Sequence, residues 1–245
     1  MEIRIARRNP DSEVVFRTKE LVQQGFDFGR TKIEGELDKT IGQLELIRRV
    51  NEAFRAEFID LGIPQFYTPL HTDSVHFLPS NVFLRVAPNP EGHAYYRDEL
   101  DAIVIDNGDF EGDIKRTIFT LLHEGGHRWS YKEFVLTKLG EPEPKIAGFR
   151  VTKPDTETYF FSSMDEAMCD FSAQTIQHQN FKLFFGEGAT PEKIQPLIGT
   201  YSKEREILLS IIEKISEVRQ EEIVKTWVRF CRHFYAGERS VLKDV

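Results

Sequence analysis

Apolar residues recur at helical spacing along much of the chain. The stripe in residues 36–61 predicts a long helix, which Gly62 and Pro64 end. Its members are Leu37, Ile41, Leu44, Ile47, Phe54, Phe58 and Leu61. Further helices are predicted over 12–24 (ended by Gly25, Asp27 and Gly29), 113–139, 163–183, 202–216 and from Ile223 to Phe234, with a short one starting at Thr190.

Residues 65–107 follow a different pattern, in which aromatic residues and valines alternate with polar residues between Pro and Gly. We expect strands at 81–86 and 94–97, and an apolar last strand at 102–106. Residues 140–157 read as a loop that lines a cleft, because Gly140 and the prolines after it cannot continue a helix. The chain therefore predicts an α+β fold, with a small antiparallel or mixed sheet packed against helices.

One predicted helix contains the motif His-Glu-x-x-His. His123 and His127 are four residues apart, so they share a helix face and both imidazoles can reach one metal ion. Glu124 is rotated about 100° from His123, which places it beside the metal as a general base. Gly125 and Gly126 each cost about 1 kcal/mol relative to Ala in a helix. Apolar neighbours must hold this turn, or another backbone must approach it closely.

Two histidines do not complete a zinc site, which for catalysis needs three protein ligands and one water. Position 133 is Glu, so a third histidine six residues after His127 is not available, and both cysteines lie downstream. Glu166 is the best candidate, 39 residues after His127 on the next predicted helix. Asp170, one turn later on the same face, can accept the second ring N–H of a metal-bound histidine.

Each of these residues has an alternative interpretation. Ser163 and Glu166 also fit a capping box at a helix start. Asp170 could be an exposed helical aspartate. Cys169 fits a buried small residue better than a zinc ligand. The sequence does not select a second donor for the reaction from Tyr131, Tyr159, His178 and Tyr201, and it gives no metal role to His71, His76 and His93.

Together the two motifs resemble those of gluzincins, zinc peptidases that add a Glu from a downstream helix, often as Glu-x-x-x-Asp. They are closest to the ImmA/IrrE family, whose metal helix typically reads Arg-Phe-Thr-Leu-Ala-His-Glu-Leu-Gly-His. Here residues 118–127 read Ile-Phe-Thr-Leu-Leu-His-Glu-Gly-Gly-His, and residues 166–173 read Glu-Ala-Met-Cys-Asp-Phe-Ser-Ala. The family's second helix often has Glu-Ala, small residues and then Phe-Ala.

This resemblance covers residues 95–180. It implies a zincin-like fold with the metal site at the base of a cleft, zinc ligands His123, His127 and Glu166, and Glu124 as the base. Two features depart from the family pattern. The gap before Glu166 is longer than usual, and the helices predicted at 36–61 and 202–235 have no counterpart.

Composition limits the possible functions. With 245 residues, 40% of them hydrophobic, we expect one domain over 1–245. Its parts are N-terminal helices in 1–64, the sheet and metal helix in 65–139, and a helical part with the third ligand in 140–245. The net charge of −8 argues against a nucleic-acid-binding surface. Without a signal-peptide segment, a run of eighteen apolar residues or a disulfide framework, we expect a cytoplasmic protein with no membrane contact.

We therefore expect a metallopeptidase with Zn²⁺ as cofactor that cuts a selective protein or peptide substrate. The substrate should bind as an added strand beside residues 101–106, just before the metal helix, where an edge strand offers backbone groups near the metal. One alternative is a regulatory zinc module that binds a protein without cutting it. The other is a structural helical protein without metal.

Overall fold

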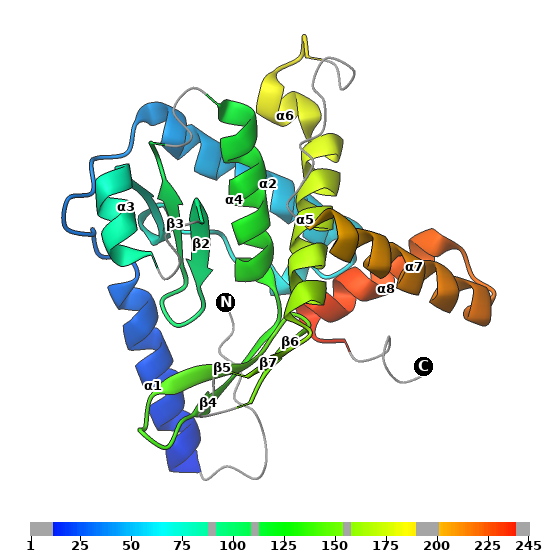
Figure 1. Ribbon diagram of the computed structural model, residues 1–245, viewed down its shortest axis with the longest axis horizontal. Coiled ribbons are helices and arrows are strands. Elements are labelled where there is room, and N and C mark those ends of the chain that lie inside the picture. Colours follow the sequence, from blue (N-terminus) through cyan, green and yellow to red (C-terminus); the bar gives the residue numbers. More distant parts are fainter. Residues whose placement is uncertain (1–11, 88–91, 109–112, 154–157, 190–200, 239–245) are drawn as a thin grey trace.

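Two helices, α4 (Ile114–Trp129) and α5 (Ser162–Gln179), lie side by side at the centre of the computed structural model (Figure 1). It describes residues 12–87, 92–108, 113–153, 158–189 and 201–238. Helix α2 (Ile41–Asp60) packs against both central helices, and α7 (Ser202–Arg219) and α8 (Ile223–Ala236) form a hairpin beside α5. The shorter helical elements are α3 (Ser80–Val86), α6 (Phe181–Phe185), η1 (Pro64–Phe66) and η2 (Thr72–Ser74).

The first sheet is mixed and has the strand order β1-β3-β2. Strand β1 (Val75–Leu78) runs parallel to β3 (Ala102–Asp106), with Val75 opposite Ile103. Strand β2 (Ala94–Arg97) runs antiparallel to β3 on its other side. All of β3 is buried, because it lies between two strands and contacts α3 and α4. In the chain, this sheet precedes α4, the helix that carries the His-Glu-x-x-His motif.

The second sheet is antiparallel and follows α4 in the chain. Its strands β4 (Lys132–Leu136), β5 (Pro142–Ala147), β6 (Arg150–Thr152) and β7 (Tyr159–Phe160) pair in chain order. Helix α1 (Ser12–Phe28) packs against β4 and β5, as the lower part of Figure 1 shows.

The predicted ends of the first two helices were wrong. Helix α1 continues through Gly25 to Phe28. Gly25 does not end the helix but allows the backbone of Glu99 to approach it closely, since a Cβ on this residue would lie 2.3 Å from the carbonyl oxygen of Glu99. Helix α2 starts at Ile41 instead of 36, because Thr40 and Gln43 form a reciprocal capping box.

Residues 81–86 form helix α3, and not the expected strand. Val82 and Phe83 pack on Leu78 and Val104, and short apolar runs do not separate helix from strand. The all-antiparallel arrangement was also wrong, since β1 pairs in parallel; the mixed alternative is the observed one.

The helix expected over 113–139 is present, but its end at 139 was wrong, and so was the loop expected over 140–157 as far as residue 153; residues 154–157 lie outside the described part of the chain. Helix α4 ends at Trp129, and β4 and β5 form a hairpin, with β6 beside β5. Pro142 and Pro144 fit in β5 because β6 pairs with this strand only at Ile146 and Ala147. On the edge of β5 that faces β6, no neighbouring strand therefore needs a backbone N–H from either proline. The helix expected over 163–183 divides into α5 and α6 at Asn180. The helices predicted at 202–216 and from Ile223 are confirmed, whereas the one at Thr190 lies outside the described residues.

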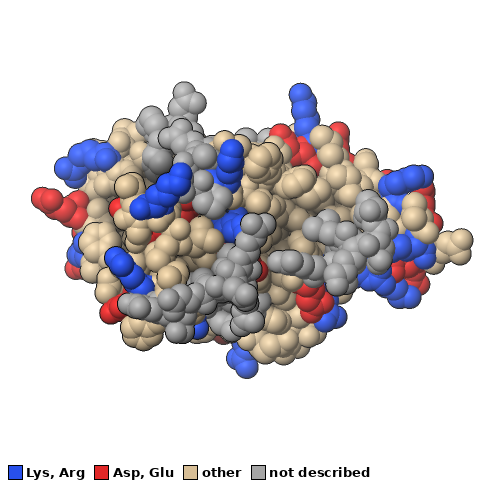
Figure 2. Space-filling view, turned by 90° about the horizontal axis from the view of Figure 1, so that it is seen from below, with Lys and Arg blue, Asp and Glu red and all other residues tan. Residues whose placement is uncertain are grey.

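The main hydrophobic core joins these layers. It combines buried residues from α2, β1, β3, α4, α5 and α8, and in it Phe54 stacks on Trp129 at 4.1 Å between ring centroids. The organisation as one domain stays a prediction. On the outside, basic and acidic side chains are mixed at the end formed by α7 and α8 (Figure 2), where Lys214 pairs with Glu217 and Arg229 with Glu221.

No helix within the described ranges has the length and apolar character needed to cross a bilayer.

One buried carboxyl in the core, Glu57 of α2, makes stability pH-dependent. Burial, followed by repulsion from Asp60, raises its pKa from 4.5 to about 7. The folded protein therefore binds this proton more tightly than the unfolded chain, so this stabilising contribution is complete below pH 4.5 and is lost as the pH rises through 7. We expect Glu57→Gln to stabilise the fold at pH 8 by up to about 3 kcal/mol, which calorimetry would show as a rise of up to roughly 6–12 °C in the melting temperature.

The gain should shrink as the pH falls toward 5. Glu20→Gln on the exposed side of α1 is the control and should change little at either pH. A Glu57→Gln gain that is equal at pH 5 and pH 8 would contradict the raised pKa.

Candidate metal centre

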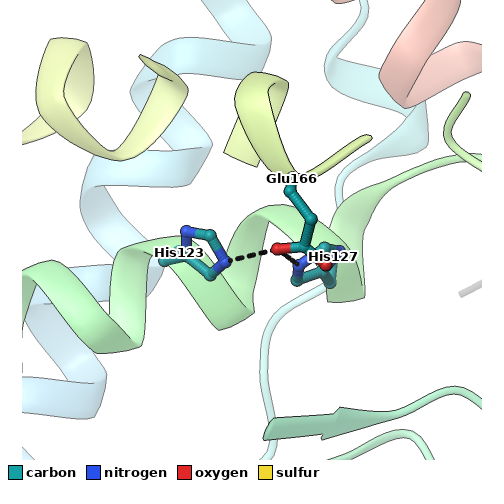
Figure 3. Close-up of side chains that lie close together, drawn as sticks. All are labelled: His123, His127 and Glu166. Atoms are coloured by element: carbon teal, nitrogen blue, oxygen red, sulfur yellow. Dashed lines mark hydrogen bonds and ion pairs between the residues drawn. The ribbon is translucent and has the colours of Figure 1, made fainter. Parts of the chain in front are cut away.

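Three predicted ligands meet between α4 and α5. His123 and His127 lie on successive turns of α4, and Glu166 reaches down to them from α5 (Figure 3). Glu166 Oε2 is 3.2 Å from His123 Nε2 and 3.3 Å from His127 Nε2. Tetrahedral zinc ligands at their usual bond lengths lie about 3.4 Å apart, so these separations fit one metal ion. We call these residues the donor triad.

Two further carboxylates orient the imidazoles. His123 Nδ1 is 3.0 Å from Asp170 Oδ1, and His127 Nδ1 is 3.2 Å from Asp165 Oδ2. An ionised carboxylate only accepts hydrogen bonds, so each Nδ1 donates its proton. Without a metal, each Nε2 must carry a second proton to donate to the Glu166 oxygen. A metal ion can take the place of these protons between the three atoms, so the donor set fits a metal ion.

The same contacts shift the acidities of the triad. Burial lowers the pKa of His123, but hydrogen bonds to Asp170 and Glu166 outweigh it and raise the pKa to about 9. The pKa of His127 is also raised, because nearby Cys169, Glu166 and Asp165 outweigh its burial. Burial raises the pKa of Glu166, but His127 and His123 bring it well below the usual value. The centre therefore holds negative charge that favours a cation.

Glu124 lies beside the triad and is 8% exposed. Burial raises the pKa of its carboxyl, and His123 and His127 offset part of that rise. The carboxylate accepts a hydrogen bond from the backbone N–H of Tyr96 in β2. A raised pKa brings a carboxylate closer to the range that suits a general base at neutral pH.

The two glycines of the motif allow neighbouring helices to approach. A Cβ on Gly126 would lie 3.3 Å from the Cα of Cys169 in α5, and a Cβ on Gly125 would lie 2.8 Å from the ring of Phe54 in α2. The close backbone approach expected from the sequence is therefore confirmed at Gly126. It brings Glu166 within reach of the histidines.

In the structure, Glu166 is not part of a capping box and Asp170 is not an exposed aspartate. Helix α5 starts at Ser162 after Phe161, without a side-chain cap, so Ser163 lies inside the first turn and forms no capping box. Asp170 is only 1% exposed. Cys169 is buried beside His127, and burial raises the pKa of its thiol to about 12. Cys169, His127 and Asp165 form the second group among the described residues that could hold a metal; His71, His76 and His93 belong to neither group.

Sequence reasoning missed Asp165 and did not select Tyr201. Asp165 could have been found in the sequence because it immediately precedes Glu166. Its Oδ1 accepts a hydrogen bond from the backbone N–H of Phe149 at 2.9 Å. The ring of Tyr201 stacks on His123 with 6.0 Å between centroids, and its hydroxyl bonds to Glu166. Burial raises the pKa of Tyr201 to about 12. Nothing in the sequence marks this contact, because Tyr201 follows Glu166 by 35 residues and lies just before another helix, α7.

The other second-donor candidates have other environments. Tyr131 bonds to Glu133, Tyr159 is exposed beside Arg150, and His178 lies in the last turn of α5.

Comparison of the chain with known protein families, curated proteins and solved structures finds no match.

The orienting carboxylates give the first prediction on the metal. We expect Asp170→Asn and Asp165→Asn each to weaken zinc binding about 10–100-fold, because the amide keeps the shape but loses the charge that holds the imidazole N–H. Competition with a chelator measures the affinity. Asp73→Asn, at an exposed turn, is the matched control. If both buried variants bind zinc like the parent, these contacts only pack the helices.

Proposed function

We propose that this chain is a zinc-dependent metallopeptidase of the gluzincin type. The observation that carries the proposal is the donor triad, whose ligand atoms all lie within 4.8 Å of one another beside the buried carboxyl of Glu124. The resemblance of residues 95–180 to the ImmA/IrrE family supports the same interpretation. Zinc is favoured over Mg²⁺ or Ca²⁺ because two of the three donors are imidazoles.

Each residue of the site has a separate role in the proposed reaction. Zinc held by His123, His127 and Glu166 would supply a Lewis acid that lowers the pKa of a bound water and polarises the scissile carbonyl. Glu124 takes the proton from the attacking water and passes it to the leaving amine. Tyr201 is our candidate for the second donor to the developing oxyanion, since a phenol with a pKa of about 12 stays protonated at neutral pH.

The expected substrate position beside residues 101–106 was wrong, because β3 already pairs on both sides with β1 and β2. In the described part of the sheet, β2 is the edge strand on the side of Glu124, whose carboxylate Tyr96 contacts. We therefore propose that an extended substrate segment pairs with β2. Backbone pairing of this kind makes little demand on sequence, so selectivity must come from side-chain contacts.

Ala94 offers a test of this pairing. The N–H of Asp106 bonds to the carbonyl of His93 at 2.8 Å, so alternation directs the backbone groups of Ala94 away from β3. Ala94→Pro removes an outward N–H and leaves the ladder intact. We expect cleavage to slow about 3–10-fold, the loss of one hydrogen bond, while zinc stays bound.

Ala94→Val is the matched control, because it changes the side chain and keeps the N–H. The initial rate of cleavage of one protein substrate measures both variants. Equal rates for Ala94→Pro and the parent would remove β2 as the substrate edge.

The function itself is tested on purified full-length protein. Elemental analysis should find about one zinc per chain. Incubation with cell extract, with and without a chelator, should produce new N-termini in one or a few proteins only when zinc is present. Bound zinc without any new terminus would favour the non-catalytic regulatory module. Absence of zinc would favour a structural protein. The cytoplasmic location stays a prediction.

A further inference from the structure

Lys132 is a fully buried cation at the end of the metal helix. It is the first residue of β4, and its side chain is 0% exposed. Its ammonium donates to the carbonyl oxygen of His127 at 2.5 Å and to that of Arg128 at 3.1 Å. These carbonyls belong to the last turn of α4, the negative end of the helix dipole, where the carbonyl of His127 also accepts from the N–H and the hydroxyl of Ser130. The lysine therefore holds the turn that carries the second histidine of the triad.

On its other side the same ammonium contacts β2 and the turn after it. Its Nζ lies 4.8 Å from the ring centroid of Tyr96 and 3.6 Å from Asp98 Oδ1. Tyr96 is the residue whose backbone N–H bonds to Glu124. Asp98 also pairs with Arg150 of β6. Lys132 thus connects the end of α4 with the strand that holds the general base.

Fold stability alone does not call for a charge at this position. Burial lowers the pKa of Lys132, against the effect of Asp98 and Asp101, which reflects the cost of removing an ammonium from water. A methionine of similar length would fill the space without that cost. The lysine instead supplies directional hydrogen bonds, which hold the carbonyls of His127 and Arg128 in a fixed position relative to the carboxylate of Asp98.

We propose that Lys132 is a positioning residue of the metal centre. It fixes the last turn of α4 against β2, and so sets His127 and Glu124 relative to each other and to the edge at which the substrate pairs. This inference rests on the proposed function. It adds a residue that touches neither metal nor substrate and acts through the geometry of those that do.

The test compares Lys132→Met with Lys145→Met in the full-length, zinc-loaded protein. Lys145 lies on the neighbouring strand β5 and is partly exposed, so it controls for loss of a lysine from this sheet. We expect Lys132→Met to stay folded with about one zinc, and to lose about 10-fold or more in kcat with little change in KM, since small misplacements of reacting groups are costly. The visible spectrum of the Co²⁺-substituted protein should also change, because it reports the ligand geometry.

A kcat equal to that of the parent, together with an unchanged Co²⁺ spectrum, would overturn the inference. If Lys132→Met does not fold, Asp98→Asn replaces it, because it weakens the β2 side of the same contact while Lys132 stays in place; its Co²⁺ spectrum must then change.

Failure of the proposed function is distinguishable from failure of this inference. A parent that cleaves nothing removes the peptidase activity, whereas a spectrum that differs between parent and Lys132→Met still supports the positioning role.

Discussion

Glu124→Gln is expected to lower peptide hydrolysis at least about 100-fold, within the range that a general base contributes, while the protein keeps its zinc and its fold. The amide cannot accept the proton of the attacking water. It does retain a carbonyl oxygen that can accept the N–H of Tyr96, so the contact to β2 survives the change. Initial rates of cleavage, zinc content and melting temperature measure the three parts of this expectation.

Glu133→Gln is the matched control for this variant. Glu133 lies a few residues after the motif, on β4, and bonds to Tyr131 instead of the donor triad. Its substitution should leave cleavage close to the parent rate. Comparable hydrolysis by Glu124→Gln and the parent would remove Glu124 from the chemistry, even if zinc were bound by the expected ligands.

Local spacing was enough to predict the donor triad and Asp170, one of the two carboxylates that orient its imidazoles. His123 and His127, like Glu166 and Asp170, are four residues apart, and a helix places such pairs on one face whatever surrounds it. Glu166 was found because a zinc site needs a third ligand. The motif residues thus constrain one another chemically, and this kind of constraint can be read without knowing the fold.

Contacts that depend on tertiary structure were not predictable in this way. Strand β3 looks like an edge in the sequence because it directly precedes the metal helix, yet β1, from 27 residues earlier, pairs with its free side. The prolines of β5 suggest a loop, and only the short pairing with β6 explains why they fit a strand. Tyr201 reaches the triad because α7 packs against α5, which no local pattern encodes.

The donor triad also predicts what happens when its third member is removed. Glu166→Ala should weaken zinc binding by more than about 100-fold, beyond the effect expected for an outer carboxylate, because it removes a direct ligand and the negative charge that faces both Nε2 atoms. The remaining Nδ1 contacts to Asp170 and Asp165 orient the imidazoles but do not replace the missing oxygen. Chelator competition and elemental analysis of the purified variant measure this loss.

Ser163→Ala separates a ligand from a helix cap. If Glu166 served mainly as half of a capping box, both substitutions would destabilise the start of α5 to a similar degree and both would leave zinc in place. As a ligand, Glu166 alone controls the metal, so Ser163→Ala should bind zinc like the parent. Full zinc content in Glu166→Ala would mean that other residues hold the ion. Cys169 and Asp165, which lie beside His127, would then be the next to substitute, since with that histidine they form the other potential metal group in the described chain.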